Sequence, residues 1–200
     1  MMHPQQEFIL QGSVHDSHAE MLLHRLQGLC DNADSKAEMF LDREYVFSIK
    51  NPNGQPLSLR VRQDLEKQDY PWHLRYLGQP EIGDRNRATL VRSCIDVATS
   101  NNVCQFLAEM GFKKDFEFIS KGYMFKKGRL KVIVAKIIRL LQPDAPLAKD
   151  NYENVTQSYL VEVSVVAPSG SDQLADEIKQ FTDQLRPLVN LEKIDPRRPA

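Results

Sequence analysis

The chain has 200 residues, of which 42% are hydrophobic and 26% charged, a composition that argues against disordered, collagen-like and membrane-spanning classes. At this length folding buries roughly 70% of the surface that the unfolded chain exposes, so a full core forms without disulfides or metals. The formal net charge of −1 gives no global attraction to nucleic acid or to an anionic membrane, so any basic surface must be local.

The N-terminal half is predicted to form strands around one helix. A strand over residues 5–14 precedes a helix that begins with a capping box, Ser17 and Glu20, and carries one apolar stripe to residue 30. Strands follow near residues 40–50 and 57–63, and Asn-Pro-Asn-Gly turn chemistry joins them as a hairpin. In the strand at 57–63 leucine and valine alternate with serine and arginine, which predicts a half-buried antiparallel strand.

The C-terminal half continues the pattern of strands. They are predicted near residues 72–78, 88–99, 113–125, 130–141 and 157–167. A helix over residues 102–110 stops at Gly111, which is expected in the left-handed conformation. A Lys-Gly turn at 127–128 joins two of the strands, and a last helix runs from residue 171 or 172 until Pro187 ends it.

These elements predict an α+β fold, a single antiparallel β-barrel with three peripheral helices. No βαβ alternation occurs, and closing the sheet into a barrel hides strand edges most completely. No repeat or Gly/Ser/Pro-rich linker divides the chain, so residues 1–200 are expected to be one domain. A tail at residues 1–5 and a loop at 143–156 are expected to be flexible.

Ordinary catalytic and metal motifs are missing. Cys30, Cys94 and Cys104 are widely spaced, which predicts free thiols in a reducing compartment. His15 and His18 are interpreted as solvent-facing residues at a strand-to-helix junction rather than metal ligands. We therefore expect no catalytic, cofactor or metal site.

A triphosphate tunnel phosphohydrolase is one alternative, because such enzymes are closed antiparallel barrels. They hold Mg²⁺ and phosphate with Glu-x-Glu-x-Lys on one strand face, whereas the first strand here reads Glu7, Ile9 and Gln11. No two glutamates in the chain lie two residues apart. The near misses are Asp42/Glu44, Asp64/Glu66 and Asp115/Glu117.

An RNA-binding domain is the second alternative. Residues 113–139 hold nine basic residues against two acidic ones, and residues 121–125 partly match an RNA-recognition strand whose aromatic residues would include Tyr123 and Phe125. A basic hairpin that meets an acidic protein partner, or is merely solvated, is the favoured interpretation. Lys126 and Lys127 are its candidate partner-binding residues.

Residues 71–81 contain the only tryptophan of the chain. Trp72, Arg75 and Tyr76 have the composition of an interface hot spot. Trp72, Leu74 and Tyr76 also share one strand face and alternatively fill the barrel. A core role is favoured for Trp72 and an interface role for Arg75.

Several separated blocks resemble the Mediator subunit 18 family of animals. They are residues 10–14 (LQGSV), 23–32 (LHRLQGLCDN), 71–81, 109–112 (EMGF), 158–168 (SYLVEVSVVAP), 187–189 and 191–196. The departures lie at the N-terminal tail and at two candidate loops, residues 31–39 and 143–156.

The resemblance implies a barrel similar to the triphosphate tunnel fold but without its catalytic residues, in a nuclear, non-catalytic subunit of the head module of this transcription coregulator. The implied partners are the related barrel subunit 20, a helix of subunit 8 and RNA polymerase II, with no cofactor, no specific nucleic acid and no membrane. Trp72, Arg75 and Tyr76 are the residues we expect to contact the captured helix.

Overall fold

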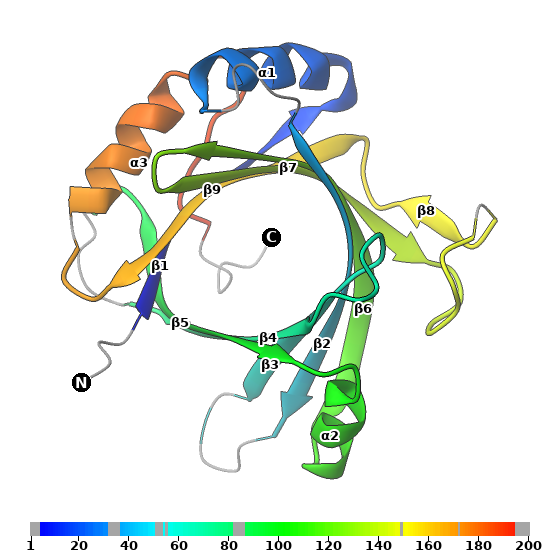
Figure 1. Cartoon of the computed structure of the whole chain (residues 1–200). Helices are drawn as coiled ribbons and strands as arrows, with labels where there is room; N and C mark the ends of the chain where they lie inside the picture. The colour runs from blue at the N-terminus through cyan, green and yellow to red at the C-terminus, as the bar shows by residue number, and fades with distance from the viewer. Residues whose placement is uncertain are drawn as a thin grey trace.

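A computed structural model describes residues 5–31, 37–50, 54, 56–81, 87–148, 150–171 and 173–194 (Figure 1). Its strands are β1 (Gln5–His15), β2 (Glu38–Ile49), β3 (Leu57–Asp64), β4 (Trp72–Pro80), β5 (Leu90–Thr99), β6 (Lys113–Lys127), β7 (Leu130–Leu140), β8 (Tyr152–Asn154) and β9 (Ser158–Pro168). Its helices are α1 (Asp16–Leu29), α2 (Val103–Glu109) and α3 (Gln173–Asp183). None of these described helices has the length and apolar character needed to cross a membrane.

The strands form one antiparallel sheet in the order β6-β2-β3-β4-β5-β1-β9-β7-β8. An additional pairing between β6 and β7 joins the two sides of the sheet, so eight strands close into a barrel, and the short β8 pairs with the C-terminal end of β7 (Figure 1). The α+β barrel and the eight predicted strands are confirmed. The sequence missed β8, which has only three residues and lies inside the predicted loop at 143–156.

The main hydrophobic core lies between the barrel wall and two helices on its outer side. Leu22 and Leu26 of α1 and Ile178 of α3 are fully buried there, against Val132 of β7 and Val161 of β9. The apolar stripes predicted for the first and last helices therefore pack on the outside of the barrel, and α1 and α3 lie side by side over β1, β9 and β7 (Figure 1).

A smaller core lies under α2. Val103 and Leu107 of α2 pack with Phe47 and Val61, and Trp72 packs against this cluster on the outer side of the barrel. Trp72 therefore packs against a hydrophobic core, but on the outside: the alternative that Trp72, Leu74 and Tyr76 fill the barrel is wrong. Each strand has two faces, and the apolar face of β4 is turned outward toward α2.

Two details at the ends of α1 and α2 test the predicted helix boundaries. The capping box at Ser17 is wrong: α1 is capped by His15, whose Nδ1 accepts a hydrogen bond from the backbone N–H of Ser17 at 3.3 Å. Gly111 has φ +92 after α2, as predicted. The predicted turn residues 51–53 lie outside the described residues.

A buried ion pair binds the backbone at the start of the loop at 143–156. Arg43 donates from Nε and Nη2 to Oε2 of Glu117, at 3.1 and 2.9 Å, and its Nη1 donates to the carbonyl oxygen of Ala145 at 3.1 Å. Oε1 of Glu117 accepts the backbone N–H of Asp144 at 2.6 Å. These contacts fix residues 144 and 145, while flexibility of the whole loop stays a prediction. Of the tail, residues 1–4 lie outside the described part, and residue 5 begins β1.

Candidate functional site

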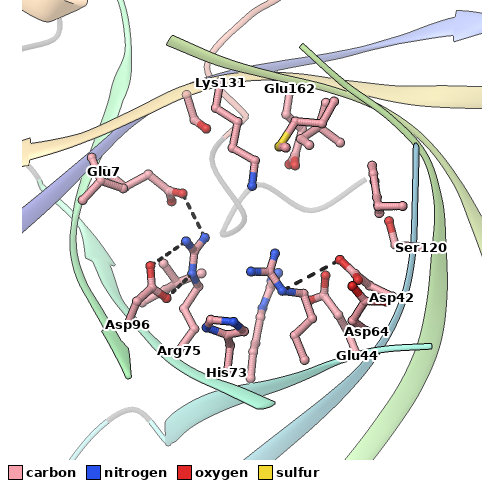
Figure 2. Close-up of a pocket in the computed structure, with 18 of the residues that line it drawn as sticks. Glu7, Asp42, Glu44, Asp64, His73, Arg75, Asp96, Ser120, Lys131 and Glu162 are labelled. Carbon is pink, nitrogen blue, oxygen red and sulfur yellow. Dashed lines mark hydrogen bonds and ion pairs between the residues drawn. The ribbon is translucent and has the colours of Figure 1, made fainter. Parts of the chain in front are cut away.

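The barrel encloses a cavity of about 530 Å³ that is lined mainly by charged side chains (Figure 2). The acidic residues are Glu7, Glu38, Asp42, Glu44, Asp64, Asp96 and Glu162, and the basic ones are Arg60, Arg62, Lys67, Arg75, Arg92, Arg129 and Lys131. Ser120, Ser164 and His73 add polar groups. The cavity is therefore a polar interior that holds both signs of charge.

Strand alternation explains why the charges gather inside. In β3, β4 and β5 every second residue faces the cavity, and these positions include Arg62, His73, Arg75 and Asp96. The intervening residues of the same strands are uncharged and face outward. This part of the wall therefore has its charged face inside and its apolar face outside.

The best-defined part of the cavity is a network around Arg75. Its guanidinium donates to both carboxylate oxygens of Asp96, at 2.6 and 2.7 Å, and to Glu7 at 3.3 Å. Arg92 donates to the other oxygen of Glu7 at 2.7 Å. Although burial by itself raises the pKa of Asp96, the hydrogen bonds and charge of Arg75 outweigh it and lower that pKa.

The opposite side of the cavity holds less firmly paired charges. Asp42 lies 3.8 Å from Nε of Arg62, too far for a hydrogen bond, and burial raises its pKa to about 6. Burial also raises the pKa of Glu162, although a hydrogen bond from Gln11 lowers it in part. Burial, followed by the charges of Arg62 and Arg75, lowers the pKa of Lys131.

Of the three acidic pairs that came nearest to a tunnel-enzyme motif, one pair and one residue of a second reach the cavity. Asp42, Glu44 and Asp64 do line the cavity, but Glu117 holds the loop with Arg43, and Asp115 accepts a hydrogen bond from Ser48. Within the described ranges no group of three or more His, Cys, Asp or Glu side chains is placed to hold a metal ion.

The structure separates the three residues predicted to contact a helix. Arg75 points into the cavity, where it is held by Asp96 and Glu7 (Figure 2). Trp72 lies on the outer side and stacks on Tyr45, with ring centroids 6.0 Å apart. Tyr76 shares the outward-facing side of β4 with Trp72, because residues four apart in a strand lie on one face. The three therefore do not form one surface, and a partner-binding role for each stays a prediction.

The outer face of β3, β4 and β5 is a surface that the sequence reasoning missed. Tyr76 lies between Leu59 of β3 and Ile95 of β5 in register, and Leu74 lies opposite Val97. Ile95 is 58% exposed and Val97 48%, so no described element covers this part of the sheet. The available signal was the alternation of Ser93, Ile95, Val97 and Thr99 with charged or small residues.

The basic segment does not form a single positive face. Lys131 enters the cavity, whereas Lys136 bonds Asp16 and the carbonyl oxygens of Thr156 and Ser158. Lys127 lies 3.9 Å from Asp31, and Arg129 pairs with Glu177 at 3.0 Å. The predicted positive field is thus reduced by internal pairing, because successive strand residues point to opposite faces.

The aromatic residues of the partial RNA motif are not free to stack on bases. Phe125 is only 1% exposed, and Tyr123 packs against the same hydrophobic core. Base stacking needs exposed rings on a sheet surface. The RNA-binding alternative loses its main support.

The surroundings of the three cysteines and of His15 and His18 are those of structural residues. Cys30 and Cys94 are buried and Cys104 is half-buried, all as free thiols, and burial raises the pKa of Cys30 to about 11. Nδ1 of His15 and Nδ1 of His18 lie 3.0 and 3.2 Å from the hydroxyl oxygen of Ser17 at the start of α1. The two rings therefore belong to the strand-to-helix junction.

Comparison with known proteins connects this barrel to one family. A family model described as Med18 protein matches residues 6–198. The chain is 53% identical over 192 residues to Mediator of RNA polymerase II transcription subunit 18 of Xenopus tropicalis, covering 96% of this chain and 90% of the relative.

Two solved structures share the fold at low sequence identity. A chain of the Schizosaccharomyces pombe Mediator head module superposes with a TM-score of 0.75 at 18% identity, covering 94% of this chain and 98% of that one. The putative adenylyl cyclase HpAC1 from Hippeastrum, described as having a dominant triphosphatase activity, superposes with a TM-score of 0.52 at 12% identity, covering 94% of this chain and 90% of that one. Given the near full-length family match and the identity to subunit 18, the chain belongs to the Med18 family.

Proposed function

We propose that the chain is a non-catalytic subunit of the Mediator complex that acts in the nucleus as a protein-interaction scaffold of the head module. The observation that carries the proposal is the 53% identity to a Mediator subunit 18 over 96% of the chain. The cavity supports it, because the first strand lacks Glu-x-Glu-x-Lys and Glu7 is engaged by Arg75 and Arg92. The triphosphatase activity of HpAC1 belongs to a distant relative of the fold and favours no second function.

The outer face of β3, β4 and β5 is the surface we assign to partner binding. Its partner is an amphipathic helix of subunit 8, whose apolar anchors at i, i+3, i+4 and i+7 fit the uncharged part of this face that α2 leaves uncovered. Ile95, Val97 and Tyr76 supply apolar and aromatic contacts there, with Trp72 at its edge against α2. Subunit 20 and RNA polymerase II are the other proposed partners, through surfaces that this helix leaves free.

The assembly test uses the full chain, tagged and purified from nuclear extract. Recovery of a large complex that contains other Mediator subunits supports the scaffold function, and recovery of the chain alone contradicts it. Ile95→Glu places a charge on the outer face and is expected to reduce recovery of subunit 8. Val155→Glu is the matched control, because Val155 is 55% exposed, also β-branched and lies just beyond β8.

Calorimetry with the subunit 8 helix as a peptide tests the contact directly. Tyr76→Ala is expected to weaken binding at least about fivefold, equivalent to about 1 kcal/mol, because aromatic contacts dominate such interfaces. Arg75→Ala tests the residue that faces the cavity, and unchanged affinity removes it from the binding site. Absence of peptide binding to the wild-type chain would disprove helix capture while leaving the assembly result intact.

A further inference from the structure

Basic side chains converge on one region of the cavity from two walls. Arg60 and Arg62 are two residues apart on β3 and both line the cavity, and Arg60 lies directly opposite Arg75 of β4. Lys131 enters from β7 and points across the cavity toward the wall that carries Arg75 (Figure 2). Like charges placed directly opposite each other on neighbouring strands are destabilising unless a counter-charge lies between them.

The carboxylates of the cavity are shared unevenly among its basic side chains. Glu7 is shared by Arg75 and Arg92, and Asp96 is held by Arg75 through two hydrogen bonds. In the part of the chain that the structure describes, neither the guanidinium of Arg60 nor the ammonium of Lys131 has a hydrogen-bond or ion-pair partner. Two cations are therefore unpaired at the same cavity.

The acidic neighbours of Lys131 do not offset the effects of its burial and of the nearby arginines on its pKa. Burial lowers its pKa most, the charges of Arg62 and Arg75 lower it further, and Asp42 and Glu162 oppose them only in part. Burial raises the pKa of both Asp42 and Glu162, which favours their neutral forms. Glu44 also lines the cavity and lies opposite Arg62 in register, so it is one of the acidic groups that compete with an added anion.

Neutral donors lie beside these cations. Ser164 of β9 is directly opposite Lys131 of β7, and both line the cavity, so their Cβ atoms are about 5 Å apart. The hydroxyl of Ser164 can donate to the same oxygen-bearing group as the ammonium. Hydrogen bonds from charged donors to oxyanions are about twice as strong as neutral ones.

We propose that the barrel interior binds a small tetrahedral oxyanion of the phosphate class without a metal ion, between Lys131 and Ser164 on one wall and Arg60 and Arg62 on the other. The cavity of about 530 Å³ has the size of a small-molecule site. The anion supplies a counter-charge in direct contact with the two unpaired cations. Binding is reversible and involves no bond cleavage.

The test is isothermal titration of the full-length chain with inorganic phosphate in the presence of EDTA, at constant ionic strength adjusted with sodium chloride. Lys131→Met removes the half-buried ammonium and is expected to weaken phosphate binding by about tenfold or more. Lys121→Met is the matched control, because Lys121 is an exposed residue of the neighbouring strand β6 and does not line the cavity. Its affinity is expected to equal that of the wild type.

Glu44→Gln provides a second variant that does not depend on removing a cation. Loss of the competing carboxylate is expected to tighten phosphate binding several-fold. Glycerol 2-phosphate as a second probe distinguishes the source of the anion: equal affinity assigns the site to a phosphoryl group on a larger molecule, and binding of inorganic phosphate alone assigns it to the free ion.

Three results would overturn the proposal: no phosphate binding by the wild type, equal weakening in Lys131→Met and Lys121→Met, or binding that needs added Mg²⁺. The titration uses the chain by itself, so it is independent of the subunit interactions proposed above.

Discussion

Gly12 of β1 marks a place where two backbones approach closely. A Cβ atom at this position would lie 2.3 Å from the carbonyl oxygen of Asn190, in the C-terminal segment that pairs with β1 through Gln11 and Glu192. Because the contact is with backbone, neither side can move away cheaply. Because residue 12 has no side chain, the C-terminal segment can pack directly against β1.

We predict that Gly12→Ala lowers the free energy of unfolding by about 1–3 kcal/mol, the cost of forcing extra atoms into a packed region. Gly28→Ala is the control, because Gly28 lies in α1 with open space around its Cβ position. It is expected to stabilise the chain by about 0.5–1 kcal/mol through helix propensity. Urea denaturation followed by the fluorescence of Trp72 measures both, and similar effects of the two substitutions would refute the close-approach argument.

The buried ion pair of Arg43 and Glu117 is a second place where one side chain is expected to affect stability strongly. Their side chains are 9% and 5% exposed, and together they bind the backbone at Asp144 and Ala145. Removing one partner leaves the other charge buried without compensation.

We predict that Arg43→Ala destabilises the chain by about 3–5 kcal/mol. Arg139→Ala breaks the pair with Glu153, whose side chains are 68% and 46% exposed, and should cost less than about 1 kcal/mol. Chemical denaturation of both variants provides the comparison. Equal losses would mean that burial does not determine the strength of these pairs.

At the scale of elements, the β6–β7 hairpin shows how strand geometry divides a basic segment. Its turn is docked on the end of α1, because the backbone N–H of Asp31 donates to the carbonyl oxygen of Lys126 at 2.8 Å and Gly128 N–H donates to the Asp31 carboxylate at 2.6 Å. Lys126 and Lys127 remain exposed at the turn. At this turn they offer two adjacent exposed ammonium groups to a partner.

We predict that the double substitution Lys126→Glu and Lys127→Glu slows association with an acidic partner surface at low salt without unfolding the chain. Rim charges act mainly on association rates, and the effect should fade as the Debye length drops below about 10 Å above 0.1 M salt. Stopped-flow association measured over a salt series tests this, with Lys113→Glu at the start of β6 as the control. Unchanged rates at low salt would make the hairpin turn a solvated surface only.

At the scale of the whole molecule, a charged cavity makes stability depend on pH. Burial raises the pKa of Asp42 from 3.8 to about 6, so the folded chain favours the protonated form. As pH rises from about 4 to 6 the unfolded chain releases this proton more readily than the folded one. The contribution of Asp42 to the free energy of unfolding therefore falls over that window and stays lower above it.

We predict that Asp42→Asn equals the wild type in stability near pH 4 and exceeds it by about 1–3 kcal/mol at pH 7. Urea denaturation at several pH values measures this difference, and Asp69→Asn in an exposed turn provides the background. A difference that stays constant from pH 4 to pH 7 would show that Asp42 does not titrate as its burial requires.

Much of the architecture was predictable because it rests on local patterns. Period-2 alternation located the eight barrel strands, and 3.6-residue periodicity located α1, α2 and α3. The left-handed conformation at Gly111 followed from glycine chemistry. Family membership followed from blocks of sequence that span nearly the whole chain.

The tertiary structure alone decided which side of each strand faces inward. Alternation gives β4 two faces but does not say which one meets the helices, so Arg75 and Tyr76 look equivalent in the sequence and point to opposite sides in the barrel. Closure of the sheet into a barrel decides which face points inward. The helices α1, α2 and α3 cover apolar strand faces from outside, and the interior that remains is wide enough to hold ionised groups. Partners such as Glu7 and Arg75, or Arg43 and Glu117, are 68 and 74 residues apart in sequence, and only the strand registers bring them together.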